Sequence, residues 1–166
     1  MALRFAMNAG PSQAVFQRTN RRSVMTAAQM TAAELDAFLR TELPQMFNYD
    51  DLTIDHADGQ TCQMRQRFRE SMLRPGGTIS VPTLMALADF AMYPVLLSAI
   101  GPVGLAVTTN LSINFLRKGQ PGQDVLAAAR LLKLGKRLAV GEVNLLSGAS
   151  PHPIAHAIST YSIPNL

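Results

Sequence analysis

The residue in this sequence best suited to chemistry is Asp89, which stands alone in a long apolar stretch. Between Val81 and Ile100 it is the only charged side chain. A carboxylate surrounded by apolar groups needs a hydrogen-bond donor or an opposite charge, or else it takes up a proton, because burial penalises its charged form. If such a group borders a cleft, it can act as a general base.

Two other interpretations of Asp89 stay open. It can be a structural aspartate whose hydrogen bonds serve the fold alone, because acidic groups are rarely buried without a partner. The stretch is also long enough to cross a bilayer. Its prolines and the mid-run Asp89 argue against a membrane span, since a charge at bilayer depth is costly.

Few other residues offer chemistry. The single cysteine, Cys62, cannot form an internal disulfide and fits a reducing compartment, so we expect a cytoplasmic protein. Three histidines lie far apart and have no zinc-binding spacing. No Gly-rich phosphate loop is present. The sequence therefore predicts neither a metal site nor a bound cofactor.

Composition predicts one folded domain and allows several kinds of anionic partner. The chain has 166 residues, of which 48% are hydrophobic and 16% charged, enough for a core. The net charge of +4 suits an anionic partner, which can be a nucleic acid, an anionic membrane or a phosphorylated small molecule. With 6% aromatic residues and no Trp, a nucleic-acid stacking surface is poorly supported.

Residues 1–24 differ from the rest because they contain four arginines and no acidic residue. That composition is typical of a transit peptide, but it also fits a flexible basic tail before a start at Met25. We expect a flexible tail over 1–24 and a single domain over 25–166.

The elements that must position Asp89 follow from hydrophobic patterns and turn residues. Thr31 and Glu34 form a capping box that predicts a helix over 32–42. Strands are expected over 52–56 and 61–69, around an Asp-Gly turn, with a loop over 72–79. The central helix is expected over 82–100, with a kink or an early end at Pro94.

Four further strands are expected over 105–116, 124–134, 138–146 and 154–163. In the first of them, strict alternation places the odd residues from Leu105 to Phe115 on an apolar face and Thr108 on the polar face. Short connections favour antiparallel neighbours. The sequence thus predicts an α+β fold in which an antiparallel sheet curls around the central helix.

Several of these segments together resemble a known family. The Leu-Ala-Asp of the central helix, the Thr-Thr-Asn-Leu-Ser-Ile-Asn-Phe-Leu-Arg strand, the Gly-Lys-Arg turn and the terminal Thr-Tyr-Ser-Ile-Pro are similar to those of hotdog-fold acyl-CoA thioesterases. The resemblance is to the phenylacetate-pathway type within the 4-hydroxybenzoyl-CoA thioesterase group. It covers residues 30–164 and implies a hotdog fold and a homodimer or dimer of dimers.

The resemblance also implies a site. Asp89 corresponds to the carboxylate that activates water or attacks the thioester, Val81 to the helix N-terminal N–H that binds the carbonyl oxygen, and Thr108 to the hydroxyl that places the water. The family combines these groups across a dimer interface, so we expect Val81 from one chain and Asp89 from the other. A regular helix keeps the two apart within one chain, at ~1.5 Å of rise per residue.

The substrate would be an acyl-CoA, with CoA as a part of the substrate and not a cofactor. Its phosphates would meet basic side chains at turns. Where the family has an Asn and a His-Gly-Gly, this sequence has Arg74 and Ser80-Val81-Pro82. Because of these departures, a second possible function stays open, namely a module that binds an acyl-CoA without hydrolysing it. A hydratase is the least supported of the three functions, because no His lies near Asp89 in the sequence. The expected substrate-binding residues are Arg74, Gly77, Ser80, Lys118, Lys136 and Arg137.

Overall fold

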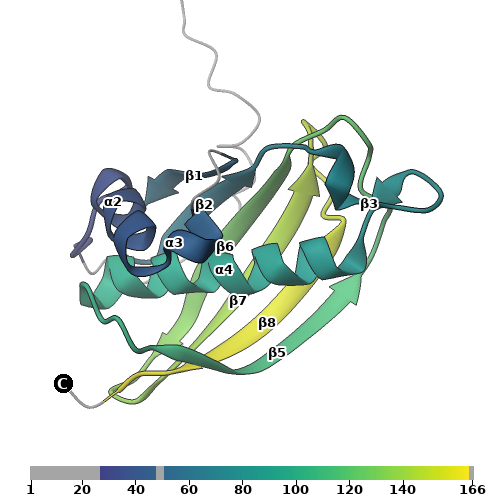
Figure 1. Ribbon diagram of the computed structural model, residues 1–166. Helices are drawn as coiled ribbons and strands as arrows, with labels where there is room; N and C mark the ends of the chain where they lie inside the picture. Colours follow the sequence, from purple (N-terminus) through teal and green to yellow (C-terminus); the bar gives the residue numbers. More distant parts are fainter. Residues whose placement is uncertain (1–26, 48–50, 165–166) are drawn as a thin grey trace, which may run out of the picture.

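The computed structural model describes residues 27–47 and 51–164. One long helix, α4 (Val81–Ile100), lies across an antiparallel sheet that curls around it, as Figure 1 shows. This arrangement confirms the expected α+β hotdog fold. The basic tail predicted for 1–24 falls outside the described residues.

The main sheet has six antiparallel strands in the order β1-β2-β6-β7-β8-β5. The helix α2 (Ala32–Glu42) begins at the predicted capping box, in which the Thr31 N–H donates to Glu34 Oε2 over 2.8 Å. Pro44 starts a short second helix, α3 (Pro44–Phe47). The strands are β1 (Leu52–Ala57), β2 (Thr61–Gln66), β5 (Val107–Phe115), β6 (Val125–Leu134), β7 (Leu138–Ser147) and β8 (Ala155–Ser162).

Helix α4 is the centre of the hydrophobic core. Its second half is buried from Ala91 to Ala99, while Val81 and Met85 in the first half are exposed. By length and composition it could cross a membrane, but most of it is buried inside the fold, so it is the core helix of this domain. The early end expected at Pro94 is wrong, because the helix continues to Ile100 and ends at Gly101 with a φ of 87°. Packing on every side offsets the one backbone hydrogen bond that proline removes.

The helix lies especially close to the sheet at Gly141 of β7. A Cβ atom at this glycine would stand 2.6 Å from Met92 Sδ and 2.5 Å from Met92 Cε. Real Cβ atoms do not come so close to other heavy atoms, so the absence of a side chain at Gly141 lets the flexible end of Met92 lie directly on the strand.

Three other expectations need correction. Strand β2 ends at Gln66 and not at residue 69, and the segment expected as a loop over 72–79 contains a small hairpin, β3 (Leu73–Arg74) and β4 (Thr78–Ile79). Strand β5 does not pair with β6, the next strand in the sequence, but with β8. Strand β5 therefore forms one edge of the sheet, and the turn after it crosses to the middle.

Candidate active site

The Asp89 carboxylate lies between helix α4 and the edge of the sheet, where it is partly buried. The hydroxyl of Thr108 on β5 donates a hydrogen bond of 2.5 Å to Asp89 Oδ1. The fold thus brings together the two side chains that the resemblance named as carboxylate and hydroxyl. They are 19 residues apart in the sequence.

Thr108 reaches Asp89 because strand β5 contains a β-bulge. The pairing with β8 runs from Thr108 opposite Tyr161 directly to Asn110 opposite Thr160, so Thr109 is the extra residue. Strict alternation had placed Thr108 on the polar face of the strand. That expectation is wrong, since the bulge turns Thr108 to the side of the helix while Asn110 stays on the outer side. Bulges often re-aim a side chain beside a functional site.

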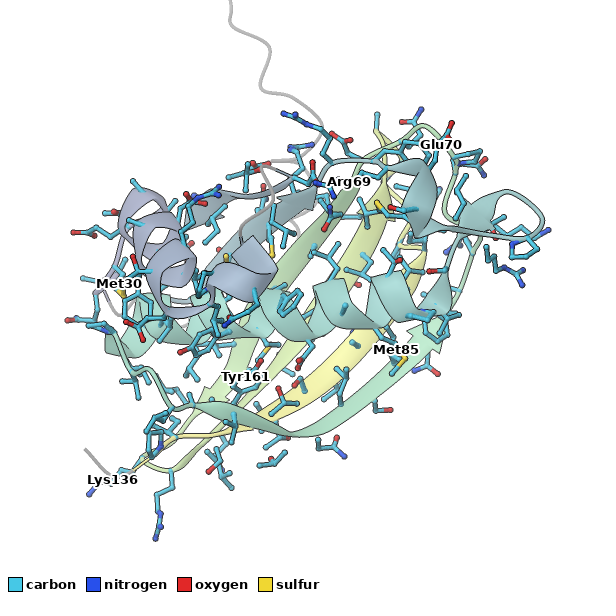
Figure 2. All side chains as sticks on the ribbon, in the orientation of Figure 1. Met30, Arg69, Glu70, Met85, Lys136 and Tyr161 are labelled. Carbon is cyan, nitrogen blue, oxygen red and sulfur yellow. The ribbon has the colours of Figure 1, made fainter. Side chains whose placement is uncertain are left out.

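A third residue completes this group and was missed by the sequence reasoning. The hydroxyl of Tyr161 on β8 lies 3.0 Å from the backbone oxygen of Asp89 and 3.4 Å from Asp89 Oδ1. Figure 2 shows Tyr161 on the sheet beneath helix α4. The signal in the sequence was the position of Tyr161 in the last predicted strand. The sequence does not show that this strand pairs with the strand that carries Thr108.

Burial keeps Tyr161 protonated. The side chain is 4% exposed, which raises the pKa of the Tyr161 phenol well above its usual value, and the negative charge of Asp89 raises this pKa further. The ring also stacks on Tyr93, with a centroid separation of 6.4 Å and an interplanar angle of 19°. The phenol therefore acts as a hydrogen-bond donor to Asp89 at any pH near neutrality.

The second carboxylate oxygen of Asp89 is free. Both hydroxyl donors meet Oδ1, and within the described residues Oδ2 has no hydrogen-bond partner. A carboxylate held through one oxygen can use the other to accept a proton or to attack a carbonyl carbon.

The N-terminus of helix α4 offers one free backbone donor. Ser80 is the N-cap, and its hydroxyl accepts the N–H of Thr83 over 3.4 Å. Pro82 has no N–H. The Val81 N–H has no partner among the described residues, so it is the donor that remains for a ligand. The partial positive charge of a helix N-terminus favours a developing negative charge there.

The β3–β4 hairpin lies beside this helix end, as Figure 1 shows. Arg74 Nε donates to Thr78 Oγ1 over 3.0 Å, and Gly77 turns the chain with a φ of 71°. Ile79 packs against Gly119, where a Cβ atom would lie 2.7 Å from Ile79 Cγ1. This contact fixes the position of the chain just before helix α4 begins. It also places the exposed Lys118 at the same end of the molecule.

The other two predicted basic residues lie at the opposite end of the sheet. Lys136 and Arg137 form the tip of the β6–β7 hairpin, where Figure 2 labels Lys136. Two residues after Arg137, Ala139 of β7 pairs with Tyr161 of β8, and Tyr161 pairs in turn with Thr108 of β5. The predicted residues thus form two groups, one around the helix N-terminus and one around Asp89. They do not converge within one chain.

The described residues hold no cluster of three histidine, cysteine or acidic side chains that could bind a metal ion. His156 lies on the outer face of the sheet, where it contacts Glu142, which is also paired with Arg130. Cys62 is fully buried, and burial raises the pKa of its thiol far above the usual value. None of these side chains joins the Asp89 group.

Comparison with known proteins adds to this geometry. A family model described as the thioesterase superfamily matches residues 76–150. A search of curated proteins found no match. Among solved structures, the chain is similar to a protein from Silicibacter sp. TM1040 that carries a provisional thioesterase name. The two are 40% identical, the alignment covers 88% of this chain and 100% of the other, and the TM-score is 0.79.

Two further structures extend the comparison. A variant of the phenylacetic acid degradation protein PaaI from Thermus thermophilus is 25% identical, with 73% of this chain and 99% of that chain covered and a TM-score of 0.62. Zebrafish thioesterase superfamily member 2 is 18% identical, with 82% and 100% covered and a TM-score of 0.72. At that identity, the zebrafish protein supports the fold alone.

Proposed function

Since this chain belongs to the hotdog-fold thioesterase superfamily, we propose that it is an acyl-CoA thioesterase, which hydrolyses a thioester to a carboxylic acid and free CoA. The observation that carries this proposal is the Asp89 carboxylate. It projects from the core helix, is held at Oδ1 by Thr108, and is free at Oδ2. Oδ2 is not among the buried atoms of the described residues that lack a partner, so it is accessible to a water molecule or a ligand, as a group that activates water must be.

Hydrolysis needs a proton acceptor and a place for negative charge. Asp89 Oδ2 takes the proton of a water molecule as that water attacks the thioester carbon, or Oδ2 itself attacks that carbon. The carbonyl oxygen then becomes negative, and the Val81 N–H at the helix N-terminus stabilises it. The C–S bond breaks, and the CoA thiolate leaves and takes up a proton. Where Oδ2 is the attacking atom, this leaves a mixed anhydride on Asp89, and a water molecule must then hydrolyse it to release the carboxylic acid and restore the carboxylate.

Asp89 and Val81 must come from different subunits for this mechanism. They are eight residues apart on one continuous helix, which is ~12 Å along the axis at ~1.5 Å per residue. Strand β5 is an edge of the sheet, with exposed apolar side chains at Val107 and Phe115. Such an edge can pair with another strand.

A two-fold pairing of β5 with its copy would join the two halves of the site. In an antiparallel pair related by a two-fold axis, the start of one strand faces the end of the other. The start of β5 carries Thr108 next to Asp89, and its end leads through Lys118 to Gly119, which contacts Ile79 just before helix α4. The dimer would therefore bring Asp89 of one protomer toward Val81 of the other.

The substrate is proposed to be bound through its CoA phosphates. Lys118 at one end and Lys136 with Arg137 at the other are exposed, and the two-fold arrangement would bring the two ends near one another. Lysine and arginine bind phosphate through charge-assisted hydrogen bonds. Arg74, held by Thr78, would lie near the thioester. No cofactor is proposed beyond the CoA of the substrate, and we place the protein in the cytoplasm.

The test is a hydrolysis screen over short-chain, medium-chain and aryl acyl-CoAs, with release of free thiol as the readout. Asp89→Asn keeps the size of the side chain but removes its charge, and we expect kcat to fall more than about a hundredfold. Asp55→Asn is the matched control, because Asp55 pairs with Arg65 away from Asp89. If Asp89→Asn hydrolyses at the wild-type rate, Asp89 has no part in the mechanism.

A second candidate is a module that binds an acyl-CoA without hydrolysing it. The observation that favours it is the single free donor at the helix N-terminus. Pro82 supplies no N–H, and the Val81 side chain beside that donor is 42% exposed and narrows the approach. Binding of acyl-CoAs by calorimetry, without turnover of any of them, would support this function over hydrolysis.

A further inference from the structure

Tyr161 contacts Asp89 at two atoms, one in the main chain and one in the side chain. Its hydroxyl is 3.0 Å from the backbone oxygen and 3.4 Å from Oδ1. The phenol has a single proton, which it shares between the nearer backbone oxygen and Oδ1, so the hydroxyl contacts both the helical turn that carries Asp89 and the carboxylate itself. Thr108 and Tyr161 are directly opposite one another on neighbouring strands, so both donors reach Oδ1 from the sheet.

Tyr161 is itself held in place. It is 4% exposed, and its ring stacks on Tyr93 of helix α4. The Tyr93 hydroxyl points elsewhere and donates to the backbone oxygen of Val103 over 3.2 Å. Two stacked tyrosines thus have separate hydrogen-bond partners, and only one of the two hydroxyls meets Asp89.

We propose that Tyr161 is a positioning residue for the reaction, which together with Thr108 holds Asp89 through Oδ1 so that Oδ2 alone faces the substrate. This inference rests on the proposed function. Without the Tyr161 hydroxyl, Oδ1 keeps one donor, and the carboxylate can rotate so that neither oxygen has a fixed direction. A misplaced general base lowers the rate of the chemical step and leaves substrate binding intact.

The test compares Tyr161→Phe with Tyr93→Phe, because each variant loses one hydroxyl and keeps the stacked ring pair. For Tyr161→Phe we expect kcat to fall about tenfold to a hundredfold with KM within about twofold of the wild type. For Tyr93→Phe we expect both constants to stay within about twofold. Equal losses in the two variants, or no loss in Tyr161→Phe, would overturn the proposal.

A double-mutant cycle separates positioning from a general effect on the fold. If Tyr161 acts through Asp89, Tyr161→Phe has no further effect on the residual rate of Asp89→Asn. A multiplied loss in the double variant would instead mean that Tyr161 acts independently of the carboxylate, which is contrary to the proposal.

A crystallographic comparison tests the same inference without turnover. In Tyr161→Phe we expect the Asp89 side chain to adopt a second rotamer, whereas Tyr93→Phe keeps the single rotamer of the wild type. An unchanged rotamer in Tyr161→Phe would overturn the positioning role. If the wild type hydrolyses no acyl-CoA, the proposed function fails, and the rotamer comparison still decides whether Tyr161 orients Asp89.

Discussion

At the residue scale, the two oxygens of the Asp89 carboxylate have different surroundings. Oδ1 receives the hydroxyls of Thr108 and Tyr161, and Oδ2 has no partner among the described residues. Hydrogen bonds to a charged acceptor are stronger than those between neutral groups. This asymmetry gives the side chain a defined orientation, which a solvated aspartate lacks.

A prediction at this scale concerns the shortest of these contacts. Thr108→Val keeps the shape of the side chain but removes the donor 2.5 Å from Asp89 Oδ1. We expect kcat for acyl-CoA hydrolysis to fall at least about tenfold, because a hydrogen bond to a charged group is lost. Thr108→Ser, which keeps the hydroxyl, should retain most of the rate.

The neighbouring Thr109 provides the control for this comparison. Its hydroxyl donates to the backbone oxygen of Thr160 over 3.2 Å and does not contact Asp89. Steady-state kinetics of Thr109→Val should therefore match the wild type. Wild-type kinetics for Thr108→Val would show that the bond to Oδ1 is irrelevant to turnover.

Some residues of the site could be predicted from the sequence, and others could not. Asp89 stood out because a charge is costly among apolar side chains, and this cost is visible in the sequence itself. The inward orientation of Thr108 depends on a bulge, and a bulge leaves no strong trace in a strand of ordinary composition. Tyr161 was missed for a related reason, since its partners come from two distant elements whose pairing no local pattern encodes.

At the scale of elements, long and strongly patterned segments were predictable. Helix α4 follows from its apolar residues, and α2 from its capping box. The small β3–β4 hairpin was expected only as a loop, because two-residue strands are too short to show alternation. Of the kink or early end expected at Pro94, the early end does not occur, because burial against the sheet outweighs the local preference of a proline.

The outer face of the sheet allows a prediction about pH. Glu142 on β7 meets Arg130 on β6 and His156 on β8, with contacts of 2.5 Å and 3.2 Å. Burial acts to raise the pKa of Glu142, but hydrogen bonds and positive charge from Arg130 and His156 outweigh it, so this pKa lies below its usual value.

A lowered pKa in the folded state gives stability that is present above the unfolded value and is lost as the pH falls through the folded one. The unfolded value is near 4.5. We therefore expect the free energy of unfolding of the wild type to decrease more steeply on acidification below about pH 4.5 than that of Glu142→Gln.

Urea unfolding at several pH values between about pH 6 and about pH 3 measures this difference. The exposed Glu70 provides the control, and Glu70→Gln should keep the wild-type slope. Identical slopes for the wild type and Glu142→Gln would mean that the three-strand ion-pair group does not stabilise the fold.

At the scale of the whole molecule, the prediction is that two copies share each site. Val81→Pro removes the proposed N–H donor at a helix position that tolerates proline, and Asp89→Asn removes the carboxylate. Each variant alone should be inactive. In a heterodimer of the two, one site has both groups intact and the other has neither.

Mixing the two inactive variants in equal amounts, under conditions that allow subunits to exchange, tests this arrangement. Half of the dimers would be mixed and half of their sites intact, so the activity should recover to about a quarter of the wild-type value. If each site lay within a single chain, the mixture would stay inactive. Light scattering on the same samples reports whether dimers form.

The close contact between Met92 and Gly141 has a consequence for how this fold can diversify. Met92 lies one helical turn beyond Asp89, and the absence of a side chain at Gly141 of β7 gives the end of Met92 a place to lie against the strand. An alanine at position 141 would come within 2.8 Å of the backbone oxygen of Arg130 and would require the end of the Met92 side chain to move away from the strand. Substitutions around the entrance for the ligand are therefore expected to be tolerated more readily than a side chain at position 141.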